Sequence, residues 1–233
     1  MNITTSHLVI LITSVVSVVF WLWFIIRYDK YEKEPLRMVL FTMIFGGLVS
    51  TTAAGFLNSL AALMTGFRVV DADGQQSPAA AVTFFLFVGF NEEFWKGILT
   101  FFLIRKSRHF NEPIDGMIYA MTVGLGFGIL ENIGYGRMFG LPVFFIRQFN
   151  AIPLHIGLSV LWGLGLSRLY FRRNLRLRAF LPYLIVPAIL HTIYNLLPQL
   201  ILNGLVITLL MSAFALLLIW AGTRILKKHQ RPS

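Results

Sequence analysis

Six ionisable side chains lie inside long apolar stretches of the sequence, where charged groups are rare. They are Glu92, Glu93, Lys96, Glu131, His155 and His191. A charged side chain at mid-membrane costs at least about 2.5 kcal/mol on insertion scales, so such groups normally face a protein interior and mark a functional site. Carboxylates and imidazoles are side chains that activate water or bind metal ions. They predict a hydrolytic or metal-binding site within the apolar part of the chain.

The first three of these residues belong to the segment NEEFWKG. Glu92 and Lys96 are four residues apart, which places them on one helix face and predicts an intrahelical ion pair. Glu93 lies about 100° round the helix, on a stripe with Gly89 and Gly97 that would let another helix approach closely. Two acids and one base leave one carboxylate free to act as a general base. A purely structural ion pair is the alternative.

The fourth residue, Glu131, ends the glycine-rich segment GLGFGILEN. Its glycines do not have the spacing of a dinucleotide-binding loop, and no strand precedes them. Gly124 and Gly128 instead form a GxxxG step, which predicts close helix packing. A carboxylate that extends to the membrane surface is the alternative interpretation of Glu131.

The two histidines lie in later apolar stretches. His155 follows Pro153, which can loosen a helix and free a carbonyl group. His191 and Asn195 are four residues apart and therefore share a helix face. Structural hydrogen bonding is the alternative for both histidines.

Together these groups could hydrolyse a peptide bond in two ways. A buried glutamate could activate water while imidazole and asparagine groups stabilise the oxyanion. Alternatively, His155, His191 and Glu131 could bind a metal, with zinc the expected ion. No HExxH motif is present, so the ligands would come from separate helices. Counting about 1.5 Å per helical residue from the outer ends of the predicted helices, we expect Glu92 and His155 at a depth of about 20 Å. Glu131 and His191 are expected at a depth of about 7 to 10 Å.

Seven apolar segments must position these residues. The chain has 233 residues, of which 57% are hydrophobic and 13% charged, against about 25% charged residues in soluble domains. The segments lie near residues 8–26, 38–64, 79–104, 114–136, 142–167, 179–197 and 201–223. Each is long enough to cross a bilayer as a helix. The sequence predicts an all-α, polytopic transmembrane helix bundle that forms one domain over residues 1–233.

The basic residues set the expected orientation. Sixteen of the 20 Lys and Arg residues lie in alternate connecting segments and the C-terminal tail. Only Arg68, Arg137 and Arg147, the last near the start of the segment 142–167, are counted on the opposite side. The positive-inside rule then places the N-terminus outside and the C-terminus inside. The basic segment 168–178 is expected to contact anionic lipid. Nucleic acid is not expected as a partner, because the positive-inside rule already accounts for the clusters of basic residues. The absence of cysteine excludes thiol nucleophiles.

Several short motifs occur in order along the chain. They are YDKYEKEPLR at 28–37, EEFWK at 92–96, FGILEN at 127–132, the lone His155 and HTIYN at 191–195. This pattern resembles the PrsW family of intramembrane proteases, relatives of the prenyl-protein CAAX proteases and the Abi proteins. The resemblance implies an endopeptidase of the bacterial cytoplasmic membrane that cuts membrane-associated proteins, as in site-1 cleavage of an anti-sigma factor.

The resemblance also implies roles for individual residues. The catalytic set that it implies is Glu92, Glu93, Glu131, His155, His191 and Asn195. The two adjacent glutamates would activate water, the histidines would bind the water, the oxyanion or a metal, and the last glutamate and the asparagine would orient them. The family has been described both as metalloproteases and as glutamate-dependent proteases, so the catalytic type stays open. A proton-coupled transporter or channel and a non-catalytic membrane scaffold are the alternative functions.

Overall fold

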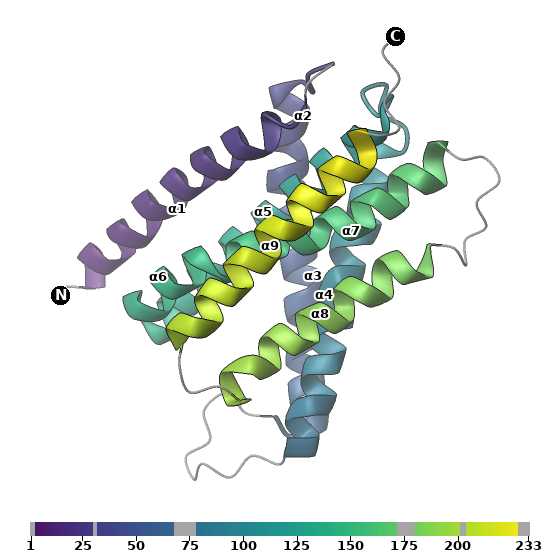
Figure 1. Ribbon diagram of the computed structural model, residues 1–233. Helices are drawn as coiled ribbons and strands as arrows, with labels where there is room; N and C mark the ends of the chain where they lie inside the picture. Colours follow the sequence, from purple (N-terminus) through teal and green to yellow (C-terminus); the bar gives the residue numbers. More distant parts are fainter. Residues whose placement is uncertain (1–2, 30–31, 68–77, 172–179, 201–203, 228–233) are drawn as a thin grey trace.

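The computed structural model describes residues 3–29, 32–67, 78–171, 180–200 and 204–227. Helices account for nearly all of these residues, and the described ranges contain no strand. The elements are α1 (Ile3–Ile26), α2 (Leu36–Phe41), a π-helical turn (Thr42–Gly46), α3 (Gly47–Thr65), α4 (Pro78–Ile104), α5 (Pro113–Phe139), α6 (Leu141–Phe149), α7 (Ala151–Phe171), α8 (Leu181–Leu200) and α9 (Gly204–Lys227). The predicted all-α fold is confirmed (Figure 1).

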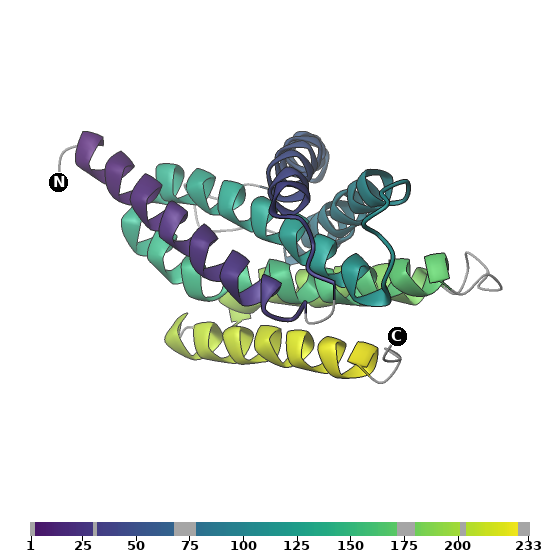
Figure 2. The ribbon, with the colours of Figure 1, turned by 90° about the horizontal axis from the view of Figure 1, so that it is seen from above.

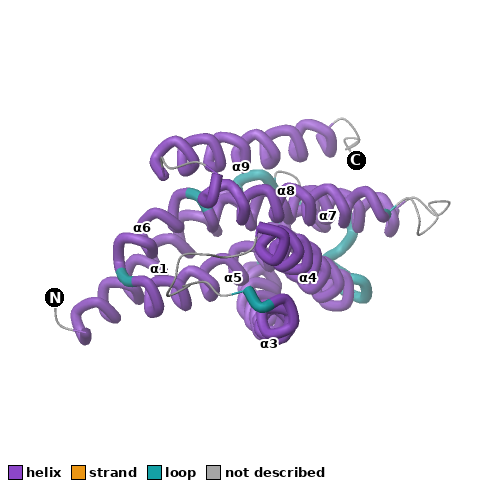
Figure 3. The backbone as a smooth tube through the Cα atoms, turned by 90° about the horizontal axis from the view of Figure 1, so that it is seen from below, coloured by secondary structure: helices purple, strands orange, loops and turns teal. Residues whose placement is uncertain are grey.

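Helices α5 and α7 form the centre of the bundle, and most of their residues are buried. Their close packing depends on Gly124, because a Cβ atom there would lie 2.7 Å from the carbonyl oxygen of His155. The close packing predicted from the GxxxG step is therefore confirmed. Helix α4 packs against α3 and α8, α9 against α7, and α1 against α5. Figures 2 and 3 show α3 and α4 nearly end-on, so they cross the other long helices steeply.

Among the described residues, five segments are long and apolar enough to cross a membrane. They are Thr4–Ile26, Leu36–Thr65, Pro113–Phe139, Leu141–Phe171 and Val206–Arg224. Helix α4 is as long as α5 but has three charged residues at its middle, and the apolar part of α8 is shorter, at Leu181–Leu197. Helices α1 and α9 run in the same direction (Figure 1), as an odd number of spans requires. The orientation with the N-terminus outside stays a prediction.

The apolar segment predicted at 142–167 is not one helix. The chain breaks at Asn150, between α6 and α7, and Gly140 with φ of 86° makes the turn that precedes α6. Pro153 is the third residue of α7. The backbone nitrogens of the first helical turn donate no hydrogen bond within the helix, so a proline there breaks none. The predicted loosening of the helix by this proline is therefore wrong. Residues 172–178 of the basic segment lie outside the described residues.

The segment between α1 and α2 is anchored to α5 by buried acidic residues. The Tyr119 hydroxyl donates a hydrogen bond to Glu34, and the Glu34 backbone N–H donates to Asp29 at 2.6 Å. At the start of α5, Glu112 and Asp115 form a capping box. Burial, reinforced by the nearby Asp29 carboxylate, raises the pKa of Glu34 to about 7.

Candidate active site

Helices α4, α5, α7 and α8 bring the predicted acids and histidines together in the middle of the bundle. The residues that meet there are Glu92, Glu93, Lys96, Glu131, His155 and His191. Glu93, Lys96 and His155 are fully buried. The rings of His155 and His191 lie edge to face with their centroids 5.1 Å apart. One connected polar cluster therefore lies in the interior of the bundle.

His155 uses both ring nitrogens within this cluster. Its Nδ1 lies 3.1 Å from the Lys96 Nζ, and its Nε2 lies 3.0 Å from the Glu131 Oε2. An ammonium group can only donate hydrogen bonds and a carboxylate can only accept them. The proton of the imidazole therefore belongs on Nε2, which donates to Glu131.

His191 has one ring nitrogen that no proton donor satisfies. Its Nδ1 lies 2.9 Å from the Glu93 Oε1, so in the neutral ring this nitrogen carries the proton. Its Nε2 then presents a lone pair to the Glu92 Oε2, 3.6 Å away. Within the described residues, that carboxylate oxygen is buried and has no hydrogen-bond partner. Two buried acceptor atoms thus face each other, and a water molecule or a cation between them would satisfy both.

Glu92 and Lys96 do not form the predicted ion pair. Lys96 pairs with Glu93, three residues earlier, whereas the other oxygen of Glu92 accepts a hydrogen bond from Asn58 Nδ2 at 2.9 Å. Asn58 belongs to α3, which packs against α4 as α8 does. The prediction was wrong because the packing of the neighbouring helices, and not the spacing along α4, decides which carboxylate meets the lysine. The predicted approach at Gly89 is confirmed, because a Cβ atom there would lie 2.6 Å from the Ala188 carbonyl oxygen of α8.

Arg147 of α6 belongs to the cluster and is not among the residues predicted for it. Its guanidinium group pairs with Glu131 and lies 3.7 Å from the centre of the Tyr135 ring. Its Nε is buried and has no partner among the described residues. The signal in the sequence was a single arginine within an apolar segment. The count of basic residues on each side of the membrane treated this arginine as part of a connecting loop. The Arg147 and Glu131 side chains are 12% and 19% exposed, so the cluster is most accessible at this end.

Asn195 lies one turn after His191 on α8 and is partly exposed. In the described part of the chain it makes no hydrogen bond to the cluster. The depths predicted for the four groups were also wrong, since Glu131 and His155 are in contact. Helix α5 continues eight residues past Glu131, and α7 begins only four residues before His155. The start of α7 lies nine residues after the predicted start at 142, so His155 is about two and a half turns closer to its helix end than predicted. The end of α5 lies three residues beyond the predicted end at 136, which moves Glu131 less than one turn deeper.

Comparison with known proteins decides the family. A sequence model described as PrsW family intramembrane metalloprotease matches residues 34–221. The chain belongs to the PrsW family. Its relatives include the protease PrsW of Geobacillus kaustophilus, with 31% identity over 86% of this chain and 83% of the relative. The protease PrsW of Bacillus subtilis is 29% identical over 86% of each chain. No solved structure matches the chain.

Membership of the PrsW family makes this protein an intramembrane protease of a bacterial membrane. It favours hydrolysis over the alternatives of a transporter, a channel or a scaffold. The matched region contains every residue of the polar cluster. The wider kinship with the CAAX proteases and Abi proteins stays a prediction, because the matches named above are to PrsW proteins.

Two members of a possible ligand set have free donor atoms for the metal implied by the PrsW family description, and the remaining member, His155, would exchange its contact with Lys96 or Glu131 for the metal. Glu92, His155 and His191 each offer a ligand atom, and these atoms lie within 4.8 Å of one another. The unpartnered oxygen of Glu92 and the lone pair on His191 Nε2 are the two atoms that a metal would satisfy. Glu93 accepts a hydrogen bond from the far nitrogen of His191, and a carboxylate in this position orients the ring of a zinc-binding histidine. The third residue of the set is Glu92, in place of the predicted ligand Glu131, which is bound to Arg147 and His155.

Proposed function

We propose that this PrsW-family protease hydrolyses membrane-associated proteins with a water held between Glu92 and His191. The observation that carries the proposal is the pair of unsatisfied acceptors, Glu92 Oε2 and His191 Nε2, 3.6 Å apart inside the bundle. A water bound there would donate both its protons, one to each acceptor. Its oxygen would then be electron-rich and free to attack a carbonyl carbon.

Glu92 is the proposed general base in this reaction. As the water oxygen bonds to the carbonyl carbon of the substrate, Glu92 takes one proton. The same proton then passes to the leaving nitrogen as the C–N bond breaks, which gives a new carboxyl group and a free amine. Asn58 holds the other oxygen of Glu92 in place at 2.9 Å.

The remaining residues of the cluster orient these groups. Glu93 fixes the proton of His191 on Nδ1, and Lys96 neutralises Glu93. Glu131 fixes the ring of His155. The proposed role of Glu93 is therefore to position His191, and no role is proposed for Asn195.

In the alternative, metal-dependent form of this site, Glu92, His155 and His191 would hold a zinc ion that would polarise the scissile carbonyl group and make bound water easier to deprotonate. Glu92 would then be a metal ligand in place of the general base. The unpartnered buried oxygen of Glu92 supports such an ion at this place. The four-coordinate geometry of catalytic zinc leaves one position for water when three protein ligands are present.

The proposed substrate is a membrane-anchored anti-sigma factor, cut at its first site outside the membrane. This proposal rests on the family resemblance and on the greater exposure of the cluster at Glu131 and Arg147. Glu92→Gln protein in membranes of the source cell should retain an uncut partner, which can be identified by mass spectrometry. A partner without a cleavable segment next to its membrane span would contradict the proposal.

Cleavage by purified protein tests the proposed function directly. Wild-type protein in micelles is expected to cut a single-span membrane protein, and His191→Ala is expected to lose at least a hundredfold in rate. Glu32→Gln, an exposed residue outside the bundle core, is the matched control and should cut as wild type does. Equal rates for wild type and His191→Ala would refute the proposal.

A further inference from the structure

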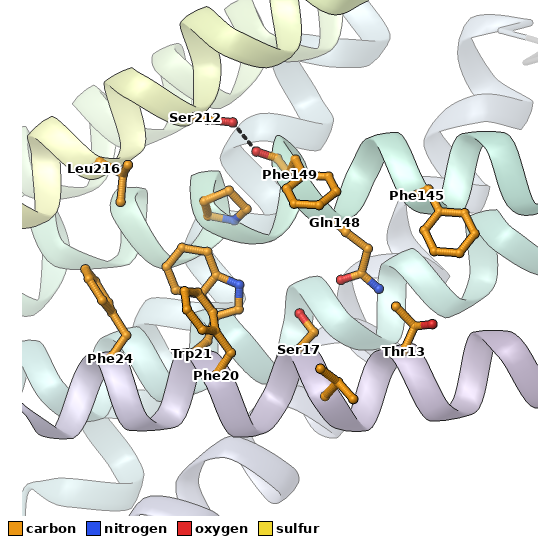
Figure 4. Close-up of a pocket in the computed structure, with 12 residues that line it drawn as sticks. Thr13, Ser17, Phe20, Trp21, Phe24, Phe145, Gln148, Phe149, Ser212 and Leu216 are labelled. Atoms are coloured by element: carbon orange, nitrogen blue, oxygen red, sulfur yellow. Dashed lines mark hydrogen bonds between the residues drawn. The ribbon is translucent and has the colours of Figure 1, made fainter.

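A groove of about 510 Å³ runs along the bundle between α1 and α9 (Figure 4). Helix α1 packs on α5 and α6, and α9 packs on α7, so the two helices form separate walls. The floor consists of α6 and the start of α7. The lining is apolar over most of its surface and includes Phe20 of α1, Phe149 of α6, Pro153 of α7 and Leu216 of α9. Its residues on α1 extend from Thr13 to Phe24, about 16 Å along the helix.

One strongly polar group faces this groove. The Gln148 side chain is 7% exposed, and within the described residues neither its Nε2 nor its Oε1 makes a hydrogen bond. Figure 4 shows its amide pointing across the groove towards Ser17 and Thr13 of α1. A buried amide without a partner is unfavourable in an apolar surrounding. The group that completes the groove must therefore both accept and donate hydrogen bonds.

This requirement separates two kinds of occupant. A lipid acyl chain matches the apolar walls but has no hydrogen-bonding group for Gln148. A transmembrane helix with one asparagine, glutamine, serine or threonine side chain matches both the walls and the amide. Such side chains bond across helix pairs in membranes.

The groove also adjoins the candidate active site. Gln148 follows Arg147, whose guanidinium group pairs with Glu131 of the polar cluster. Pro153 of the groove is two residues before His155. The α6–α7 segment therefore contributes side chains to both the cluster and the groove, so a helix in the groove would lie against the segment that carries Arg147 and His155.

We infer that this groove binds the transmembrane helix of the protein substrate, with Gln148 recognising a hydrogen-bonding side chain within that helix. This inference rests on the proposed function, because it names what the protease binds beside its catalytic cluster. The helix would be held in the groove while its extramembrane segment enters the site past Arg147 and Glu131.

Photo-crosslinking in vesicles tests the inference. The full-length protein carries p-benzoylphenylalanine in place of Phe20 or Leu216, both of which line the groove. The matched control carries it in place of Val19, a neighbour that is 63% exposed and does not line the groove. The probe is a lysine-flanked Leu/Ala helix of 23 residues with one central asparagine, and its comparison peptide has leucine there. The vesicles contain phosphatidylethanolamine and phosphatidylglycerol.

The asparagine peptide is expected to crosslink about three- to tenfold more than the leucine peptide from positions 20 and 216, in line with the strength of interhelical hydrogen bonds. Gln148→Leu should abolish this preference, and the control position should show none. Equal crosslinking of the two peptides, or crosslinks to lipid alone, would overturn the inference.

Cleavage separates this inference from the proposed function. For a single-span substrate with a central asparagine, Gln148→Leu should raise KM about three- to tenfold with a smaller change in kcat. Wild-type cleavage with no peptide preference overturns the docking site alone. Absence of cleavage by the wild type overturns the proposed function.

Discussion

Replacement of Lys96 by methionine would leave the carboxylate of Glu93 buried without a countercharge. Both side chains are fully inaccessible, and the only other polar partner of Glu93 in the described structure is His191, at 2.9 Å. Removal of one member of a buried ion pair typically costs about 3–5 kcal/mol. Loss of the contact between the ammonium and the Phe127 ring, 4.8 Å from its centre, adds about 1 kcal/mol. We expect Lys96→Met to lower the free energy of unfolding by about 4–6 kcal/mol.

A second substitution separates the charge from the packing. Lys96→Met combined with Glu93→Gln removes both charges, so it should recover all but about 1–2 kcal/mol of the lost stability. The assay is unfolding of the purified protein in mixed micelles by sodium dodecyl sulfate, followed by circular dichroism. Lys33→Met, at an exposed position, is the control. The reasoning is refuted if Lys96→Met loses less than about 1 kcal/mol, or if the double variant is no more stable than the single one.

Three further predictions concern pH, packing and metal. Because burial raises the pKa of Glu34 from 4.5 to about 7, the folded chain binds more protons than the unfolded chain between these values, and stability falls as pH rises through that window. Glu34→Gln should therefore raise the melting temperature at pH 8 but not at pH 4, and an equal effect at both would contradict this. Gly124→Ala should lower the free energy of unfolding by about 1–3 kcal/mol, because its Cβ would lie 2.7 Å from the carbonyl oxygen of His155. Gly134→Ala, on the same helix but next to open space, is the control and should not lower it. Equal melting temperatures of the two variants would argue against the close packing. For the metal-bound form, chelation with 1,10-phenanthroline should stop cleavage and added zinc should restore it, with bound zinc measured by mass spectrometry. An active preparation free of metal would exclude the metal-bound form.

The sequence predicts the elements well because each membrane-crossing segment is a long apolar stretch bounded by charge. It also predicts which buried groups belong to the site, since a carboxylate or imidazole in such a stretch must find a polar partner inside the bundle. Glu131 and His155, predicted on separate helices, contact each other directly. The family motifs point to the same residues.

The sequence does not predict how these groups pair. Residues three and four apart on a helix are equally close, so the choice of Glu93 over Glu92 by Lys96 depends on the helices that pack around α4. The break at Asn150 was missed because the apolar residues on both sides of it make one segment of membrane-spanning length, although Arg147, Gln148 and Asn150 interrupt that segment. That break places Arg147 on a short helix beside Glu131, which no periodicity along the chain could indicate.

The central claim is that Glu92 and His191 hold the attacking water, and Glu92→Gln tests it most directly. A glutamine there keeps an oxygen for the Asn58 amide and places an N–H group opposite the free nitrogen of His191. The account predicts that cleavage falls by about 10²- to 10⁴-fold, as expected for loss of a general base, while the melting temperature stays the same or rises. A variant that still cuts at near wild-type rate, or that loses activity only because it unfolds, would contradict the account.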